Sequence, residues 1–243
     1  MALAGDHIQV LVGGYELTAD SNRISFSDVR DMHDVTVFSD AAHKFIPGQV
    51  TSKLEHAGYM DAGAARSHPV LKGVTVDGVV SVLLGQNTTP VVGDPVYTIA
   101  ALQNAYNTLP EIGKYVPFVA RFASKGAYSG LWGTALAVPV SFTTTTNGSA
   151  LDNGASTPNG GIGALHVLTA SASDTYTITV EGSSTGGFGG EQTTVLTFTL
   201  NALALGSQRV SVVGTIPRYL RWRAVRSGVV GNTVKIAVSF IRL

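Results

Sequence analysis

Histidine and aspartate are the residue types in this chain that could ligate a metal ion. The chain has six histidines, and none of them forms an HxH or HExxH spacing. Asp28, Asp31 and Asp34 lie close together, but they lack the alternating ligands, glycine and distal glutamate of a calcium loop. We therefore interpret the histidines as hydrogen-bonded or solvated and the aspartates as a solvated loop or strand edge. We expect no metal and no cofactor.

Motifs that position a catalytic nucleophile are absent from the sequence. The 243 residues contain no cysteine and no GxSxG segment. The glycine-rich segment 186–190 joins two predicted strands rather than a strand and a helix, which indicates a hairpin connection and not a phosphate-binding loop. We expect that the chain is not an enzyme and has no catalytic residue.

A basic segment that begins at Arg218 is a candidate contact surface. Along a strand, Leu220 and Trp222 would share one face, and the arginines between them would share the other. The pattern predicts a core tryptophan with arginines outside, and it leaves open contact with a sugar, a partner subunit or nucleic acid. The residues assigned to this contact are Tyr219, Arg221 and Arg223.

The elements that must position these residues are mainly strands, because apolar residues alternate with a period of two. Asn-Gly and similar pairs between the runs are turn signals. The clearest alternating runs are residues 8–12, 176–180, 196–200, 210–212, 220–224 and 236–240. The sequence therefore predicts a mostly-β chain.

Two segments carry signals for the start of a helix. Ser39-Asp40 precedes a predicted turn over residues 41–45, which Pro47-Gly48 would end. Asp94-Pro95 precedes VYTIAALQNAY, where the β-branched residues leave a strand open as the alternative. We expect one short helix.

Composition divides the chain near residue 140. Only 13% of residues are charged and the formal net charge is zero, which favours self-association. Residues 1–139 carry three more acidic than basic residues, and residues 140–243 carry three more basic than acidic. We expect two β domains with these bounds, the second a jelly-roll or Ig-like β-sandwich. Its predicted core is Tyr176, Ile178, Leu196, Phe198, Leu220, Trp222, Val238 and Phe240.

No apolar run approaches the ~20 residues of a membrane helix, and the amino terminus lacks a secretory pattern. We therefore expect synthesis in a cytoplasm and no membrane segment.

Short motifs spread over about residues 5–138 resemble the tail tube proteins of long-tailed bacteriophages (siphophages). The motifs are Gly13-Gly14-Tyr15, Asp34-Val35-Thr36-Val37-Phe38, Asp40, Ala42, Phe45-Ile46-Pro47-Gly48 and Gly58-Tyr59-Met60-Asp61. The resemblance implies a tube domain, residues 1–139, followed by an appended β-sandwich domain, residues 140–243.

The resemblance also implies a function. We expect a structural virion protein of the tail, assembled in the host cytoplasm, that stacks as hexameric rings around a channel for DNA. The partners would be other copies, tail proteins such as the tape measure and terminator proteins, and DNA that passes without specific binding. We assign assembly to the segment from Asp28 to Met60, with these residues: Asp34, Phe38, Phe45, Ile46, Pro47, Gly48 and Tyr59.

Two other functions remain open at this point. The chain could be a capsid decoration protein, or a carbohydrate-binding host-adhesion protein that contacts a cell-surface glycan through residues 140–243. Within the tail-tube interpretation, we expect the second domain to project outward. A channel lined by its arginines would bind phosphates and retain DNA.

Overall fold

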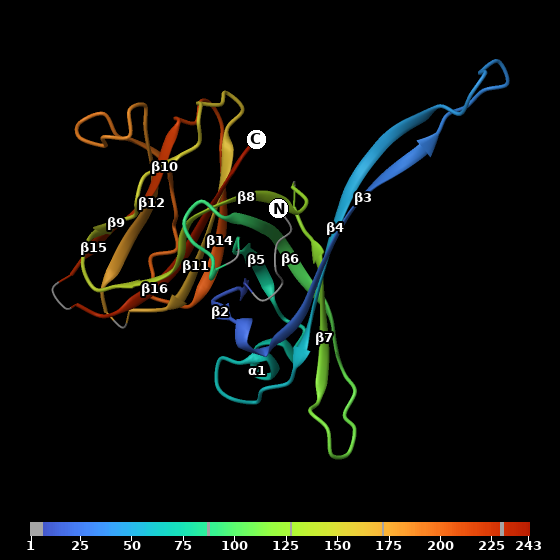
Figure 1. Ribbon diagram of the computed structural model, residues 1–243, viewed down its shortest axis with the longest axis horizontal. Helices are drawn as coiled ribbons and strands as arrows, with labels where there is room; N and C mark the ends of the chain where they lie inside the picture. Colours follow the sequence, from blue (N-terminus) through green and yellow to red (C-terminus); the bar gives the residue numbers. More distant parts are fainter. Residues whose placement is uncertain (1–6, 87, 127, 172, 229–230) are drawn as a thin grey trace.

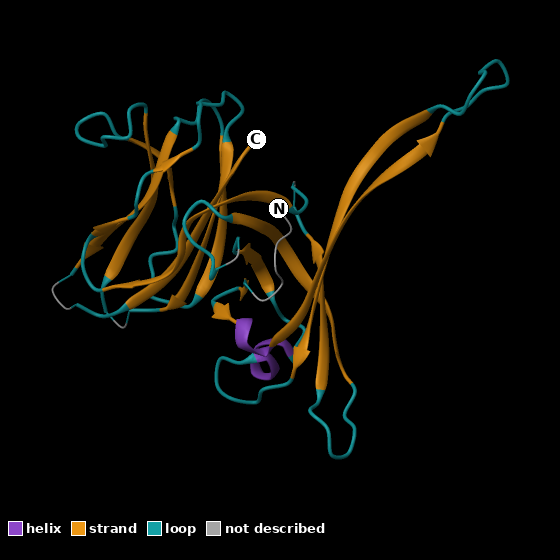
Figure 2. Cartoon of the chain, viewed as in Figure 1, coloured by secondary structure: helices purple, strands orange, loops and turns teal. Residues whose placement is uncertain are grey.

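The chain is built almost entirely of antiparallel β-strands (Figures 1 and 2). The computed structural model describes residues 7–86, 88–126, 128–171, 173–228 and 231–243. The strands up to the predicted boundary are β1 (Ile8–Val12), β2 (Tyr15–Glu16), β3 (Ser21–Asp34), β4 (Phe45–Tyr59), β5 (Asp77–Leu84), β6 (Pro95–Thr108), β7 (Pro117–Ser124) and β8 (Leu131–Phe142). The later strands are β9 (Thr146–Asn147), β10 (Leu151–Asp152), β11 (Gly161–Thr169), β12 (Thr175–Ser183), β13 (Thr193–Thr197), β14 (Gly206–Val212), β15 (Tyr219–Ser227) and β16 (Val234–Arg242). The predicted mostly-β class is confirmed.

A single short helix, α1 (Ser67–Leu71), follows β4, and a 3-10 turn, η1 (Thr18–Asp20), precedes β3 in the described chain. The buried carboxylate of Asp20 accepts a hydrogen bond from the Ser67 backbone N–H at 2.7 Å and pairs with Arg66 at 2.5 Å. This ion pair fixes the amino-terminal end of α1. The prediction of one short helix is confirmed, although neither predicted position was right.

Residues 95–108 form strand β6 instead of a helix, so the strand alternative is the correct one. Val96, Tyr97, Thr98 and Ile99 are all buried, which means that both faces of this strand are covered. A helix would bury only one stripe of the segment. The β-branched residues are typical of such a doubly covered strand.

The helical turn predicted over residues 41–45 is also wrong. Residues 35–44 form the loop of a long hairpin. The Val37 N–H donates to Asp40 Oδ2 at 3.0 Å, and the Asp40 N–H donates to the Val37 carbonyl at 2.9 Å. Strand β4 then starts at Phe45 and contains Pro47. A proline is tolerated there because β4 is an edge strand in this region, paired with β3 alone.

Strand β6 organises the larger sheet. One edge pairs with β5, and the other edge pairs first with β8, at Pro95–Thr98, and then with β7, at Ala101–Thr108. From β8 the sheet continues through β16 and β11 to β14, and from β7 it continues through β4 to β3. A second sheet, in the order β10-β15-β12-β13 with β9 beside β15, covers the β8-β16-β11 region (Figure 1).

Two hydrophobic cores follow the two halves of the sequence. The first contains Val10, Leu54, Tyr97, Phe118 and Phe122, among others. The second lies between the two sheets and contains every one of the core residues predicted for the sandwich: Tyr176, Ile178, Leu196, Phe198, Leu220, Trp222, Val238 and Phe240. The predicted core of residues 140–243 is confirmed.

The predicted boundary at residues 139 and 140 falls inside β8, which pairs with β16 from Thr134 to Phe142. One sheet therefore runs through both halves. A third apolar cluster fills the junction, where Leu11 and Leu83 meet Ala135 and Ala237. That residues 140–243 form a domain that folds alone stays a prediction.

Candidate functional site

The most prominent surface feature is a β-hairpin that projects far from the body of the molecule (Figure 1). Strand β4 pairs with β7 only from Lys53 to Tyr59, whereas its pairing with β3 continues to Phe45. We call the part beyond this three-stranded region, residues 29–51, the arm. At about 3.3 Å per residue, its β4 strand extends roughly 23 Å before the loop.

Large apolar side chains lie along the arm and are exposed. Phe38, in the loop, is fully exposed, and Phe45 and Ile46 are 50% and 54% exposed. The other exposed apolar residues of the arm are Val29, Met32, Val35 and Val37. A two-stranded hairpin has little stability of its own in water, and a concentration of exposed apolar residues indicates an interaction surface.

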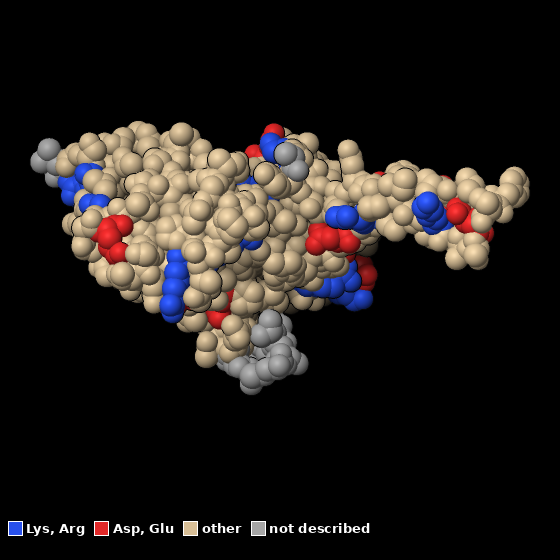
Figure 3. Space-filling model, turned by 90° about the horizontal axis from the view of Figure 1, so that it is seen from above, with Lys and Arg blue, Asp and Glu red and all other residues tan. Residues whose placement is uncertain are grey.

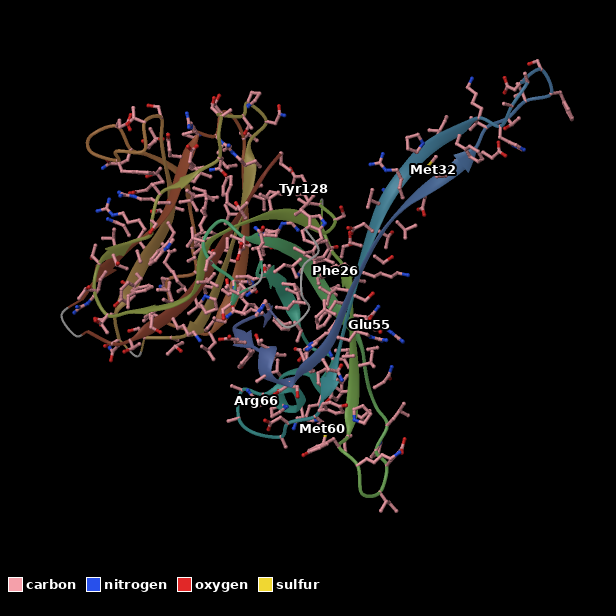
Figure 4. All side chains as sticks on the ribbon, in the orientation of Figure 1. Phe26, Met32, Glu55, Met60, Arg66 and Tyr128 are labelled. Atoms are coloured by element: carbon pink, nitrogen blue, oxygen red, sulfur yellow. The ribbon has the colours of Figure 1, made fainter. Side chains whose placement is uncertain are left out.

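The base of the arm is held to the body by contacts with the buried side chains of Tyr97 and Ser52. Asp28 accepts hydrogen bonds from the Tyr97 hydroxyl at 2.8 Å and from the Ser52 hydroxyl. The ring of Phe26 lies 4.6 Å from that of Tyr97 and 5.6 Å from that of Trp132, measured between centroids. These contacts hold the base of the arm on the body; Figure 4 shows Phe26 at that base and Met32 farther out along the arm.

Polar contacts order the far end of the arm. Asp34 accepts hydrogen bonds from the hydroxyl and the backbone N–H of Thr36, which together hold its pKa below the usual value. Its other carboxylate oxygen lies 3.2 Å from Nδ1 of His43. The ring of His43 stacks on that of Phe45 at 6.1 Å. The loop is therefore built to present Phe38 and its apolar neighbours in a defined position.

The opposite end of the same strands carries a second exposed apolar surface. There Tyr59 ends β4, beside the β6–β7 connection, and its ring lies 5.8 Å from that of Tyr115. Tyr115 is 84% exposed, and Leu109 and Ile112 are exposed as well. A groove of about 820 Å³ lies here, lined by Tyr59, Leu109, Glu111, Gly113, Lys114, Tyr115 and Pro117.

The structure separates the predicted assembly residues into two places. Tyr59 lies at the groove, at the other end of β4 from the remaining residues. The arm brings together Asp34, Phe38, Phe45, Ile46, Pro47 and Gly48. Sequence reasoning missed Leu109, Ile112 and Tyr115, although apolar residues within a turn that contains proline and glycine are a signal for them.

The predicted contact surface around Arg221 is less open than expected. Glu181, whose side chain is 5% exposed, accepts a hydrogen bond from Arg221 at 2.9 Å and one from Arg223 at 3.0 Å. The guanidinium of Arg221 also lies 4.2 Å from the ring centroid of Phe188. Tyr219 is half-buried, beneath the guanidinium of Arg218 at 4.9 Å. The arginines are thus engaged within the chain, and a role for them in glycan contact stays a prediction.

Within the described residues, no group of three or more histidine, aspartate or glutamate side chains could hold a metal ion. None of the helices in the described part of the chain is long and apolar enough to cross a membrane.

Comparison with known proteins gives distant likenesses only. No family model matches the chain, and no curated protein matches it. A chain from the virion of a native gene transfer agent particle is 14% identical, with a TM-score of 0.42 over 54% of this chain and 99% of that chain. The SPP1 tail tube is 10% identical, with a TM-score of 0.42 over 54% of this chain and 78% of that chain. The SPP1 Dit protein is 9% identical, with a TM-score of 0.33 over 97% of this chain and 99% of that chain.

Proposed function

We propose that the chain is a structural subunit of a phage-like tail tube and that it assembles with copies of itself through the arm. The observation that carries this proposal is the arm, with Phe38, Phe45 and Ile46 exposed on a hairpin that is paired to the body only at its base. Such a hairpin becomes stable when a partner covers its apolar residues. The motifs that resemble tail tube proteins lie largely in the same segment.

The composition of the rest of the surface also favours self-association. Charged side chains are sparse over the body on the face that Figure 3 shows, whereas several lie along the arm and near its base. The arm and the groove are different surfaces, so a contact between the arm of one copy and the groove of another would be heterologous. Heterologous contacts generate rings when the rotation closes and open stacks when it does not.

The finer proposal is a stack of hexameric rings in the tail of a virion, with DNA passing through the lumen. In this arrangement the first half lines the channel and the second half projects outward. The excess of basic residues after residue 140 supports that orientation, because a basic channel wall would retain DNA. Tape measure and terminator proteins would then contact the tube, and the second half would be free to meet a cell-surface glycan.

Negative-stain microscopy and light scattering of the purified protein test the proposal. We expect rings or tubes for the parent chain and monomers for a variant with both Phe45→Asp and Ile46→Asp, since charge on the arm opposes its burial. The matched control is Val213→Asp, at an exposed valine outside the arm, which should assemble like the parent. A parent that stays monomeric, or a double variant that polymerises normally, would contradict the proposal; discrete trimers would favour a capsid decoration protein.

A further inference from the structure

The arm tip and the groove lie at opposite ends of one continuous set of strands. We use arm tip for residues 35–46. Strand β4 runs from Phe45, at the tip, to Tyr59, at the groove, and β7 pairs with its groove end. Figure 1 shows the arm and the β6–β7 connection projecting in opposite directions. Therefore the arm tip of a chain cannot reach the groove of the same chain.

The two surfaces match in chemistry. The arm tip offers Phe38, fully exposed, and Val37 beside it. The groove offers the rings of Tyr59 and Tyr115 and the side chain of Leu109. Burying aromatic and aliphatic side chains of this kind against each other is favourable in free energy. Aromatic residues are also common anchors at protein interfaces.

The carboxylates near both surfaces already have partners within the chain. Asp40 accepts from the Val37 N–H, and Asp34 accepts from Thr36. At the groove, Glu111 pairs with Lys114 at 2.5 Å. Contact between the surfaces would therefore bury apolar area without leaving these carboxylates unpaired, and an unpaired buried charge is the most destabilising case.

We propose that the arm tip of one copy inserts into the groove of a second copy, with Phe38 packed against Tyr59, Leu109 and Tyr115. This inference rests on the proposed function and names its contact: a head-to-tail interface between identical chains, repeated along the strand direction. Each copy would then use its arm on one neighbour and its groove on another.

Disulfide trapping tests this contact, because the chain contains no cysteine of its own. Phe38→Cys and Tyr115→Cys are introduced into the same full-length chain, and the assembled protein is oxidised and run on a non-reducing gel. We expect a ladder of covalent oligomers that disappears on reduction. Each single variant should give at most dimers, since one cysteine per chain cannot form a ladder.

The matched control pairs Phe38→Cys with Val213→Cys, an exposed residue of the second half, and should give no ladder. All three sites are exposed, and far-ultraviolet circular dichroism of each variant checks that folding is unchanged. A second pair, Val37→Cys with Leu109→Cys, should reproduce the ladder. Rings or tubes that give no ladder with either pair, or an equal ladder with the control pair, would overturn this inference and leave the proposed function standing. A parent protein that never assembles would overturn both.

Discussion

Nδ1 of His166, on β11, lies 2.7 Å from the backbone carbonyl oxygen of Gly13, in the turn between β1 and β2, and donates a proton to it. The other ring nitrogen, Nε2, accepts from the Ser81 hydroxyl at 2.8 Å. Both contacts cross the junction between the two halves of the chain. The Ser81 hydroxyl lies 3.1 Å from that of Thr98, which lies 3.4 Å from that of Ser239. A buried polar chain thus accompanies the apolar cluster at the junction.

This histidine makes stability depend on pH. Burial lowers the pKa of His166 to about 4, and it lowers the pKa of His56 to about 4 as well. The unfolded chain therefore binds more protons than the folded chain between about pH 6.5 and pH 4, so the free energy of unfolding falls as the pH falls through that window. We expect a loss of roughly 3 kcal/mol for each histidine. Urea unfolding at a series of pH values measures it.

Replacing His166 by Gln should remove about half of this pH dependence, whatever the variant costs in absolute stability. The matched variant His56→Gln should remove a similar share of the pH dependence, because burial lowers the pKa of His56 as well. An unchanged slope in the His166 variant would show that the histidine is not buried as a neutral group.

The second prediction concerns the halves of the chain. A fragment of residues 131–243 keeps the whole of β8 beside β16, whereas a fragment of residues 140–243 keeps only its last residues. We expect the longer fragment to fold alone and to be the more stable of the two, because β8 completes the sheet and supplies Leu136 to the core. Thermal unfolding and proton NMR of both fragments compare them. If the two fragments are equally stable, β8 contributes nothing to the second domain and the boundary lies at residue 140.

The third prediction concerns Trp222, in the core of the second half. Trp222→Ala in the full chain should cost about 3–5 kcal/mol in the free energy of unfolding, because it leaves a large cavity. The matched control, Trp132→Ala, should cost clearly less, since this tryptophan is 50% exposed. Denaturant unfolding followed by circular dichroism gives both values, and similar costs would argue against the assigned burial.

The fourth prediction concerns Glu181. Glu181→Gln removes the buried carboxylate between Arg221 and Arg223. Both guanidinium groups then lose this negatively charged partner. We expect a destabilisation of about 3 kcal/mol, as for other broken buried ion pairs. Asp152→Asn, which breaks the exposed pair with Arg218, should destabilise the chain much less than Glu181→Gln does. Denaturant titration of the two variants distinguishes a structural cluster from a free arginine surface, for which both costs would be small.

The sequence by itself determined the core of the second half and the strands over residues 176–180, 210–212, 220–224 and 236–240. Apolar alternation at Tyr176, Ile178 and Val180 is a local property of the chain, and it dictates which face of β12 is buried. The same reasoning placed Trp222 inside the core. The segment 95–108 was ambiguous because β-branched residues and a helix-start signal occur together, and only the neighbours on both edges of β6 make it a strand.

Tertiary structure alone decided which strands pair and what lies at the ends of the sheet. Pairing of β8 with β16 joins residues about a hundred positions apart, and no local pattern encodes it. The same holds for Glu181, which meets Arg221 only because β12 pairs with β15. Tyr59 belongs to the predicted assembly segment, yet it lies beside Tyr115 and far from Phe38, because β4 is long enough to carry the two surfaces at its two ends. Side-chain periodicity is set by neighbours in sequence, whereas these contacts depend on the register and order of strands that are distant in sequence.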